Sequence, residues 1–286
     1  MKKVLASVAV LCAGVLSPAL HASSAQAALP RAAAVPGGVA LLPLGAVAAD
    51  AERPRVWFGE QQVLVTEDTG QWLAVVGLAL DTPAGEHELR VQTSGETRRL
   101  RFRVDTREYP EQRITIKDSS KVQLSASDLA RAEAEFATIQ QLKRHWREAT
   151  DTDMALILPA RGRPTGRFGV RRFFNGEPRS PHAGFDIAVP RGATVSADAA
   201  GRVLAVDEFF FNGKTIFVDH GNGLISMYCH LDSSAVDAGE AVVKGQRIGA
   251  AGMSGRATGP HLHWSVILNG AMVDPELFVA KAGTRR

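Results

Sequence analysis

Four histidines and one aspartate of this chain have the side chains and the spacing of a metal site. His182 and Asp186 lie four residues apart in the stretch Pro-His-Ala-Gly-Phe-Asp, and His261 and His263 lie two apart at the start of an apolar run. His230 lies between these stretches, in the run Met-Tyr-Cys-His-Leu. Zinc takes imidazole and carboxylate ligands, and three protein ligands leave a fourth position for water. We therefore predict a zinc site made by His182, Asp186 and His263.

Strand geometry indicates which of these side chains can meet. Side chains alternate along a strand, so His261 and His263 project together if their stretch is a strand. By the same rule, Tyr228 and His230 are expected to share the polar face of their strand, and that face is expected to carry the site.

The first pair of residues needs a bend in the chain. A straight strand would separate His182 from Asp186 by about 13 Å, which is too far for one ion. Pro181 and Gly184 provide the place at which the chain is expected to bend.

The elements that must position these residues are mostly strands. Apolar and alternating runs predict early strands at 55–58, 62–66, 72–80, 87–93, 98–104 and 111–116. Turn signals separate these runs at spacings typical of a β-sandwich. Later strands are predicted at 184–189, 194–197, 202–211, 214–220, 224–231, 241–248 and 261–268. The fold class is therefore mainly β, with a sandwich-like amino-terminal domain and an antiparallel carboxy-terminal sheet.

One long helix is predicted between the two β regions. Ser125, with Asp128 three residues later, is a capping signal, and apolar residues recur at steps of three and four as far as Thr150. This apolar stripe is expected to pack as a strut between the domains, the alternative being a partner-binding helix. The predicted limits are 1–27 for a signal peptide, 28–118 for the sandwich-like domain, 119–153 for the linking helix and 154–286 for the domain with the site.

Three further residues are candidates for binding substrate. Six arginines lie in the basic loop and its surroundings between residues 161 and 179. Because a guanidinium fork matches a carboxylate, Arg171 and the nearby Asn175 are candidates for holding an acidic substrate. The alternative is a solvated loop with weak surface ion pairs. Tyr228 is a candidate for a hydrogen bond to a reacting oxyanion, the alternative being a half-buried sheet aromatic.

The first 27 residues predict export from the cytoplasm. They combine two lysines, an apolar run and a terminal Ala-Gln-Ala, as in a secretory signal; an uncleaved anchor is the alternative. Removing Lys2 and Lys3 leaves 31 basic against 30 acidic residues, so the formal net charge falls from +3 to +1. This balance argues against nucleic-acid binding. Only Cys229 remains, so no intramolecular disulfide can form.

Four motifs in this order resemble the lysostaphin-type (LytM-domain) zinc metalloendopeptidases, metallopeptidase family twenty-three. The resemblance covers about residues 155–280, and the β-rich region before it is similar to the amino-terminal extension of Gram-negative members. The motifs are His182-x3-Asp186, Tyr228-x-His230-Leu231, His261-Leu262-His263-Trp264 and Val273-Asp274-Pro275.

The resemblance implies a role for each of the five site residues. His182, Asp186 and His263 would bind one zinc ion, and His230 and His261 would be catalytic. Zinc lowers the pKa of bound water towards about 7 and polarises a carbonyl. The two free histidines would then accept the proton of the water or donate to the oxyanion, in an order that the sequence leaves open.

Two residues depart from the pattern of that family. Ser265 lies where many members have an acidic residue, and Cys229 replaces the more usual alanine before the histidine. Neither change removes a predicted ligand, so they bear on specificity rather than on activity.

The resemblance implies a secreted zinc metalloendopeptidase that hydrolyses peptide cross-links of peptidoglycan, as a DD-endopeptidase in cell-wall remodelling. The periplasm is the expected location and the extracellular space the alternative, with no stable membrane insertion after processing. Expected partners are peptide stems and other cell-wall enzymes or regulators. One alternative function is a non-catalytic, LytM-like activator of a cell-wall amidase, and another is a wall-binding module based on the amino-terminal domain. Whether the cleaved bond joins D-Ala to diaminopimelate or lies in a glycine bridge is left open.

Overall fold

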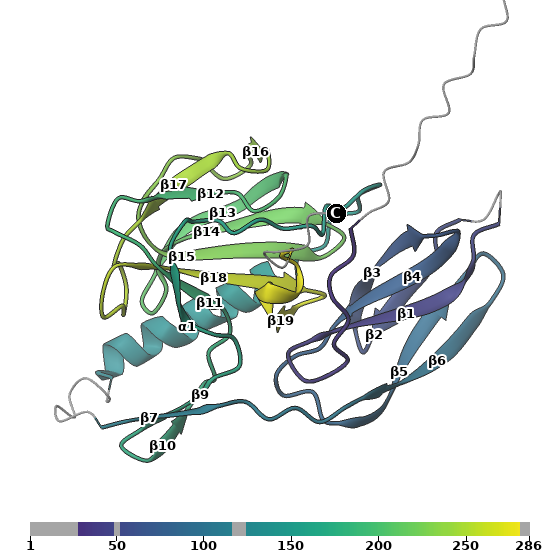
Figure 1. Cartoon of the computed structure of the whole chain (residues 1–286), viewed down its shortest axis with the longest axis horizontal. Helices are drawn as coiled ribbons and strands as arrows, with labels where there is room; N and C mark the ends of the chain where they lie inside the picture. The colour runs from purple at the N-terminus through teal and green to yellow at the C-terminus, as the bar shows by residue number, and fades with distance from the viewer. Residues whose placement is uncertain (1–27, 49–51, 116–123, 281–286) are drawn as a thin grey trace, which may run out of the picture.

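The computed structural model describes residues 28–48, 52–115 and 124–280. It is mainly β, as predicted, with two lobes that lie side by side (Figure 1). The predicted signal peptide and the predicted boundary at residue 118 lie outside the described residues. Within the described part, no helix combines the length and the apolar character that crossing a bilayer requires.

The amino-terminal lobe is a six-stranded antiparallel sheet with the order β1-β4-β3-β2-β5-β6. All six strands contribute to one apolar core, so the sheet curls on itself and is sandwich-like, as expected. In the last strand, for example, Phe102 and Val104 are buried while Arg101 and Arg103, which alternate with them, are exposed. The strands are β1 (Val39–Ala46), β2 (Arg55–Phe58), β3 (Gln61–Asp68), β4 (Gln71–Gly77), β5 (Gly85–Gln92) and β6 (Thr97–Val104).

The carboxy-terminal lobe is built on a larger sheet, whose main path runs β16-β13-β14-β15-β18-β11-β8. The short strands β12, β17 and β19 pair with this path or with one another. The strands are β8 (Arg163–Gly166), β11 (Phe185–Ala188), β12 (Thr194–Ser196), β13 (Gly201–Phe209), β14 (Gly213–Gly221), β15 (Leu224–Ser234), β16 (Ala241–Val242), β17 (Arg247–Ala251), β18 (His261–Leu268) and β19 (Ala271–Val273).

A small third sheet joins the two halves of the chain. Strand β7 (Glu111–Ile114) follows the amino-terminal lobe and pairs in parallel with β9 (Arg171–Phe174), which pairs with β10 (Glu177–Arg179). The three strands lie together beside the larger sheet in Figure 1. The basic stretch predicted as a loop therefore contains β8 and β9. Strand β8 pairs with β11, and β9 pairs with β7 as well as with the adjacent β10, so pairing beyond the local sequence helps to define both strands.

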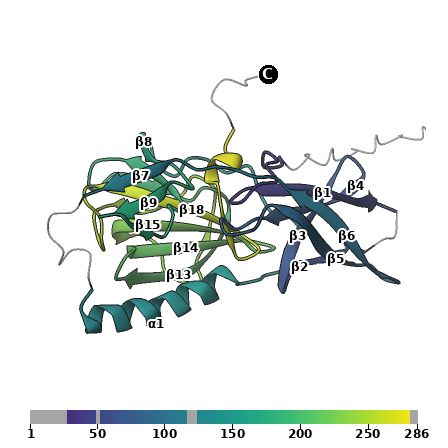
Figure 2. The same cartoon turned by 90° about the horizontal axis from the view of Figure 1, so that it is seen from below.

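The helix is shorter and more exposed than predicted. Helix α1 (Ala126–Lys143) begins at Ser125, whose hydroxyl accepts from the Asp128 N–H, but it ends well before Thr150. The apolar stripe is only partly covered, because Phe136 is 62% and Leu129 is 49% exposed. Figure 2 shows that α1 lies along the carboxy-terminal lobe, next to β13.

The two lobes are joined directly by backbone and core contacts. The Asn269 side-chain amide accepts from the Gly77 N–H over 2.6 Å and donates to the Gly77 carbonyl oxygen over 3.0 Å. Val39 and Val75 of the first lobe pack into the same buried cluster as Leu268 of the second. A short 3-10 helix, η2 (Pro275–Leu277), follows β19, and the Asp274 N–H just before it donates to Gly37 of the first lobe.

Candidate metal centre

Pairing of two strands brings the predicted ligands together. Strands β11 and β18 are antiparallel, with Asp186 opposite His263 and Ala188 opposite His261. Directly opposed residues project to the same face, so Asp186 and His263 are neighbours. His182 lies before β11 begins, where the chain bends as expected and returns its ring to Asp186.

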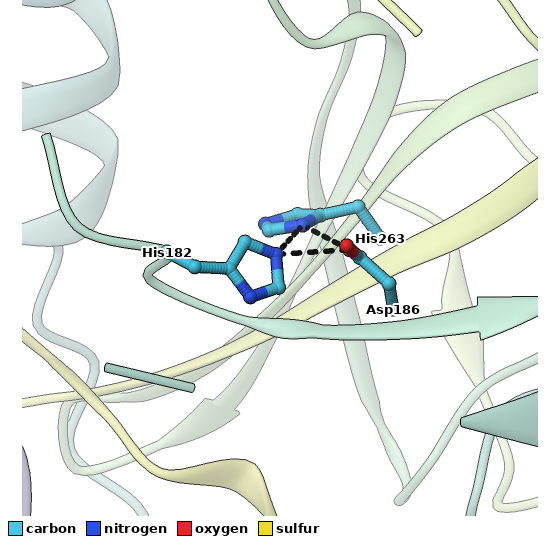
Figure 3. Close-up of side chains that lie close together, drawn as sticks. All are labelled: His182, Asp186 and His263. Carbon is cyan, nitrogen blue, oxygen red and sulfur yellow. Dashed lines mark hydrogen bonds and ion pairs between the residues drawn. The ribbon is translucent and has the colours of Figure 1, made fainter. Parts of the chain in front are cut away.

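Three polar atoms of these residues converge on one point. His182 Nε2 lies 3.0 Å from Asp186 Oδ1 and 3.1 Å from His263 Nδ1. The distance from His263 Nδ1 to Asp186 Oδ1 is 2.8 Å. Figure 3 shows the two rings and the carboxylate oriented towards this common point.

The outer nitrogens of the two rings are held by hydrogen bonds that fix their tautomers. His182 Nδ1 lies 2.8 Å from the Arg167 carbonyl oxygen, which can only accept, so this nitrogen carries the proton. Ser265 donates its hydroxyl proton to the Ala183 carbonyl oxygen over 2.9 Å. The serine oxygen must then accept from His263 Nε2, 3.0 Å away, so the proton of His263 is on Nε2. In the neutral rings the inner nitrogens, His182 Nε2 and His263 Nδ1, therefore keep their lone pairs.

Three acceptors thus face one another with no hydrogen between them. Two imidazole lone pairs and a carboxylate oxygen cannot satisfy each other at these distances, whereas a cation placed among them satisfies all three. The donor set, two imidazole nitrogens and one carboxylate oxygen, is one that zinc accepts. The residues present therefore fit a zinc ion.

Burial and charge shift the pKa values of Asp186 and His263 in the directions that favour metal binding. Burial opposes ionisation of Asp186, but its contacts with His182 and His263 outweigh that effect and hold the pKa of the carboxyl well below its ordinary value. Burial lowers the pKa of His263, which favours the neutral ring. A carboxylate and a neutral imidazole are the protonation states that metal binding needs.

The site also requires the glycine in the bend. A Cβ added at Gly184 would lie 2.6 Å from His263 Nε2 and 2.7 Å from Ser265 Oγ. Real Cβ atoms do not approach other atoms so closely, so only glycine lets the bend pass beneath the ring of His263.

A β-bulge aims His230 at the site. On β15, Cys229 and His230 together lie opposite the single residue Thr215 of β14. His230 has a left-handed φ of 59°, which is uncommon outside glycine, although histidine, asparagine and aspartate adopt it more often than other residues do. This kink brings the His230 ring to 4.7 Å from the His261 ring and 6.0 Å from the His263 ring, between centroids.

Both of these additional histidines present Nε2 as an acceptor when neutral. His230 Nδ1 donates to the Ser254 carbonyl oxygen over 2.9 Å, and His261 Nδ1 donates to the Gly259 carbonyl oxygen over 2.8 Å. His261 Nε2 lies 4.0 Å from Asp186 Oδ1, so it borders the site without being part of the close cluster. Burial lowers the pKa of His230 to about 4, which keeps this ring neutral at neutral pH.

Tyr228 lies on the other face of the sheet. It is opposite Trp264, whereas Cys229 is opposite His263, so Tyr228 points away from the site. The expectation that Tyr228 and His230 share a face is wrong, because the bulge breaks the alternation between them. Tyr228 is fully buried, and its hydroxyl accepts from the Asp198 N–H over 3.0 Å.

The structure also places Arg171 and Asn175 away from the metal centre. Arg171 is exposed and its guanidinium lies 3.3 Å from Glu111 Oε1 on β7. Asn175 is the first residue of the turn between β9 and β10, with a left-handed φ of 51° that asparagine tolerates. These positions account for both residues without contact to a substrate at the site.

Sequence reasoning did not assign a function to Ser265. The residue looked like a departure from the family pattern, yet its hydroxyl orients the ring of His263. The signal that could have found it is its position two residues after His263, on the same strand face.

A second group of polar residues lies in the core behind the site. Asp198 accepts from the Ser226 hydroxyl and from Trp264 Nε1, and its Oδ1 lies 3.2 Å from His220 Nε2. The side chains of Asp198 and His220 are fully buried, so this Ser-His-Asp group has no access to a substrate and is structural.

Comparison with known proteins agrees with this fold and site. Residues 180–275 match the model of "Peptidase family M23" and residues 32–107 match "Peptidase family M23 N-terminal domain". The crystal structure of a "putative peptidase M23" from Pseudomonas aeruginosa is 38% identical, with a TM-score of 0.72, over 85% of this chain and 94% of that one. This chain therefore belongs to peptidase family M23.

Curated relatives match over about a third of this chain. Peptidoglycan DD-endopeptidase ShyA of Vibrio cholerae is 39% identical over 95 residues, and DD-carboxypeptidase/endopeptidase Mpg of Neisseria meningitidis is 37% identical over 94 residues. Each match covers 33% of this chain and 22% of the relative.

Proposed function

We propose that this protein is a zinc-dependent DD-endopeptidase that hydrolyses peptide cross-links of peptidoglycan. The observation that carries the proposal is the convergence of His182 Nε2, Asp186 Oδ1 and His263 Nδ1, all within 3.1 Å of one another and all acceptors. His182, Asp186 and His263 would hold one zinc ion, with His230 and His261 beside it as catalytic residues.

Bound zinc would supply Lewis acidity, polarising the scissile carbonyl and lowering the pKa of a water molecule towards about 7. The chain's own part is proton transfer and orientation. The lowered pKa of His230, about 4, keeps its ring neutral at neutral pH, so its Nε2 lone pair is available to act as a general base. His261, on the adjacent strand β18, likewise presents the lone pair of its Nε2. These two rings share the roles of accepting the proton of the attacking water and donating to the oxyanion or leaving amine.

The substrate class rests on the relatives. Three proteins of Vibrio cholerae, each 39% identical over 94 or 95 residues, bear the name peptidoglycan DD-endopeptidase. Together with the signal-like first 27 residues, this supports peptide stems as the substrate and the periplasm as the location. The alternative function, a non-catalytic activator of an amidase, is disfavoured because all five predicted site residues are present and lie close together.

The decisive experiment uses purified residues 28–286 with peptidoglycan sacculi, with and without a chelator, and identifies products by mass spectrometry. We expect cross-linked dimers to be converted to monomers by cleavage of the D-Ala to diaminopimelate bond, and the chelator or His263→Ala to abolish this. Chelator-insensitive cleavage, or full activity of His263→Ala, would overturn the zinc assignment. Release of stems only when an amidase is added would instead establish the activator.

A further inference from the structure

Arg172, the neighbour of the arginine singled out from the sequence, borders the metal centre. It lines a cleft of about 640 Å³ together with His182 and Asp186. The segment from Arg107 to Gln112, which leads from the amino-terminal lobe into β7, forms another wall of this cleft. Side chains alternate along β9, so Arg171 and Arg172 point to opposite sides, and only Arg172 faces the cleft.

Within the described part of the chain, the guanidinium of Arg172 lacks a close partner. Its Nε is buried and makes no hydrogen bond with any described residue. Its Nη2 lies 3.9 Å from Asp186 Oδ2, which is too long for a hydrogen bond, and Asp186 Oδ1 faces the two ligand histidines instead. The side chain is 34% exposed, so a molecule in the cleft can reach it.

A carboxylate is the group that fits this arginine. A buried N–H without an acceptor is costly, and a guanidinium donates two parallel hydrogen bonds to a carboxylate. Because Arg172 is adjacent to Asp186, a carboxylate held there would lie next to the bond being cut rather than at a distant subsite.

We propose that Arg172 binds a free carboxylate of the substrate beside the scissile bond. The enzyme would then prefer cross-links that carry such a carboxylate. This inference rests on the proposed function. It specifies cross-links in which the carbon bearing the leaving amine also carries a free carboxylate, as in a D-Ala to diaminopimelate bond. Glycine bridges lack that carboxylate.

Binding tests this inference without relying on turnover. The ligands are a D-Ala to diaminopimelate cross-linked muropeptide dimer and the same dimer with the carboxylate beside the scissile bond converted to a carboxamide. Their dissociation constants are measured by calorimetry on zinc-loaded His230→Asn protein. We expect the free-carboxylate dimer to bind about 10- to 100-fold more tightly, the range for a hydrogen-bonded charged pair.

Adding Arg172→Ala should erase the preference, and Arg172→Lys, which keeps the charge but loses the fork, should retain only part of it. Arg101→Ala, an exposed arginine on β6 of the other lobe, is the control and should keep the full preference. Circular dichroism establishes that each variant is folded, and Arg172→Lys serves if the alanine variant is not.

Three results would overturn the inference. These are equal binding of the two dimers to His230→Asn protein, a preference that survives Arg172→Ala, and a tenfold loss of zinc affinity accompanying the loss of preference. The last would mean that Arg172 acts by positioning Asp186. Failure of the wild-type protein to cleave sacculi would instead refute the proposed function, because the binding measurement is independent of cleavage.

Discussion

The ring of His263 donates its Nε2 proton to Ser265 Oγ, 3.0 Å away on the same face of β18. The serine hydroxyl is in turn committed to the Ala183 carbonyl oxygen. This chain of two hydrogen bonds ties the bend before β11 to the strand that carries His263, and it leaves Nδ1 of that ring as the acceptor.

Replacing Ser265 by alanine should weaken zinc binding about 10- to 100-fold, as is usual when a group that orients a ligand is lost. The ring would keep its place between the strands but lose the bond that fixes its tautomer. Zinc affinity is measured by competition with a chromophoric chelator. Ser233→Ala, which removes an exposed hydroxyl from β15, is the matched control. Unchanged affinity in Ser265→Ala would show that the hydrogen bond has no orienting role.

His230→Asn should retain zinc but lose about 10²- to 10⁴-fold in the cleavage rate, the contribution of a general acid or base. Asparagine suits the test because it tolerates the left-handed φ of 59° found at this position. Zinc content and the rate of dimer cleavage are measured on the same preparation, with His87→Asn in the amino-terminal lobe as control. Loss of zinc from the variant would indicate that His230 is a ligand instead.

Tyr228→Phe should lower stability and leave the cleavage rate unchanged. The variant leaves the buried Asp198 N–H without its acceptor, at a cost of about 1 to 3 kcal/mol. Urea unfolding and kcat/KM on purified dimers separate the two effects. A large fall in kcat/KM with normal stability would indicate that Tyr228 takes part in catalysis.

The buried pair of Asp198 and His220 should make stability depend on pH. Burial disfavours both charges, but the Asp198 carboxylate outweighs it and raises the pKa of His220 above the ordinary value. The same attraction, with hydrogen bonds from Ser226 and Tyr228, holds the pKa of Asp198 below its ordinary value.

The directions of the two pKa shifts determine how each residue's contribution to stability changes with pH. The His220 contribution is complete below the unfolded-state pKa of about 6.5 and is lost as pH rises through the raised folded value. The Asp198 contribution is complete above about 3.9 and is lost as pH falls through the lowered folded value. Both contributions are therefore complete between about pH 4 and 6.5.

Urea unfolding of the metal-free protein should accordingly show a decline in stability above about pH 6.5. His220→Gln should be less stable than wild type at pH 5.5 and should lose this part of the decline, while His87→Asn should follow wild type. Parallel wild-type and His220→Gln profiles would contradict the assignment of a charged pair.

The sequence was sufficient for most of the strands and for the cluster of His182, Asp186 and His263. Strand alternation places His261 and His263 on one face, and β18 spans the predicted residues 261–268 as His261–Leu268. The same rule failed for Tyr228, because the bulge at the left-handed residue His230 interrupts the alternation of side chains. Tyr228 and His230 therefore lie on opposite faces of the sheet. No local pattern marks such a bulge, since it is set by pairing with β14.

The choice between neighbouring arginines failed for a related reason. Arg171 and Arg172 are adjacent residues of the same type, so the sequence alone does not distinguish them. Only the register of β9 against β7 decides which one faces the cleft. That register joins residues about 60 positions apart in the chain. The helix end was misjudged because the residues after Lys143 bind the turn between β14 and β15 instead of continuing the helix: the Arg147 carbonyl oxygen accepts from the Asn222 N–H, and Arg147 Nε donates to Asp219.

Because β7 pairs with β9, the structural unit around the site includes residues that lie outside the matched family domain, residues 180–275. A chain cut near residue 150 would lose β7 and the segment from Arg107 to Gln112, and with them one wall of the cleft. It would also leave the N–H and C=O groups along one side of β9 unpaired, ready to accept any extended peptide. Activity measured on such a fragment would therefore describe an enzyme with a more open and less selective entrance than that of the whole chain.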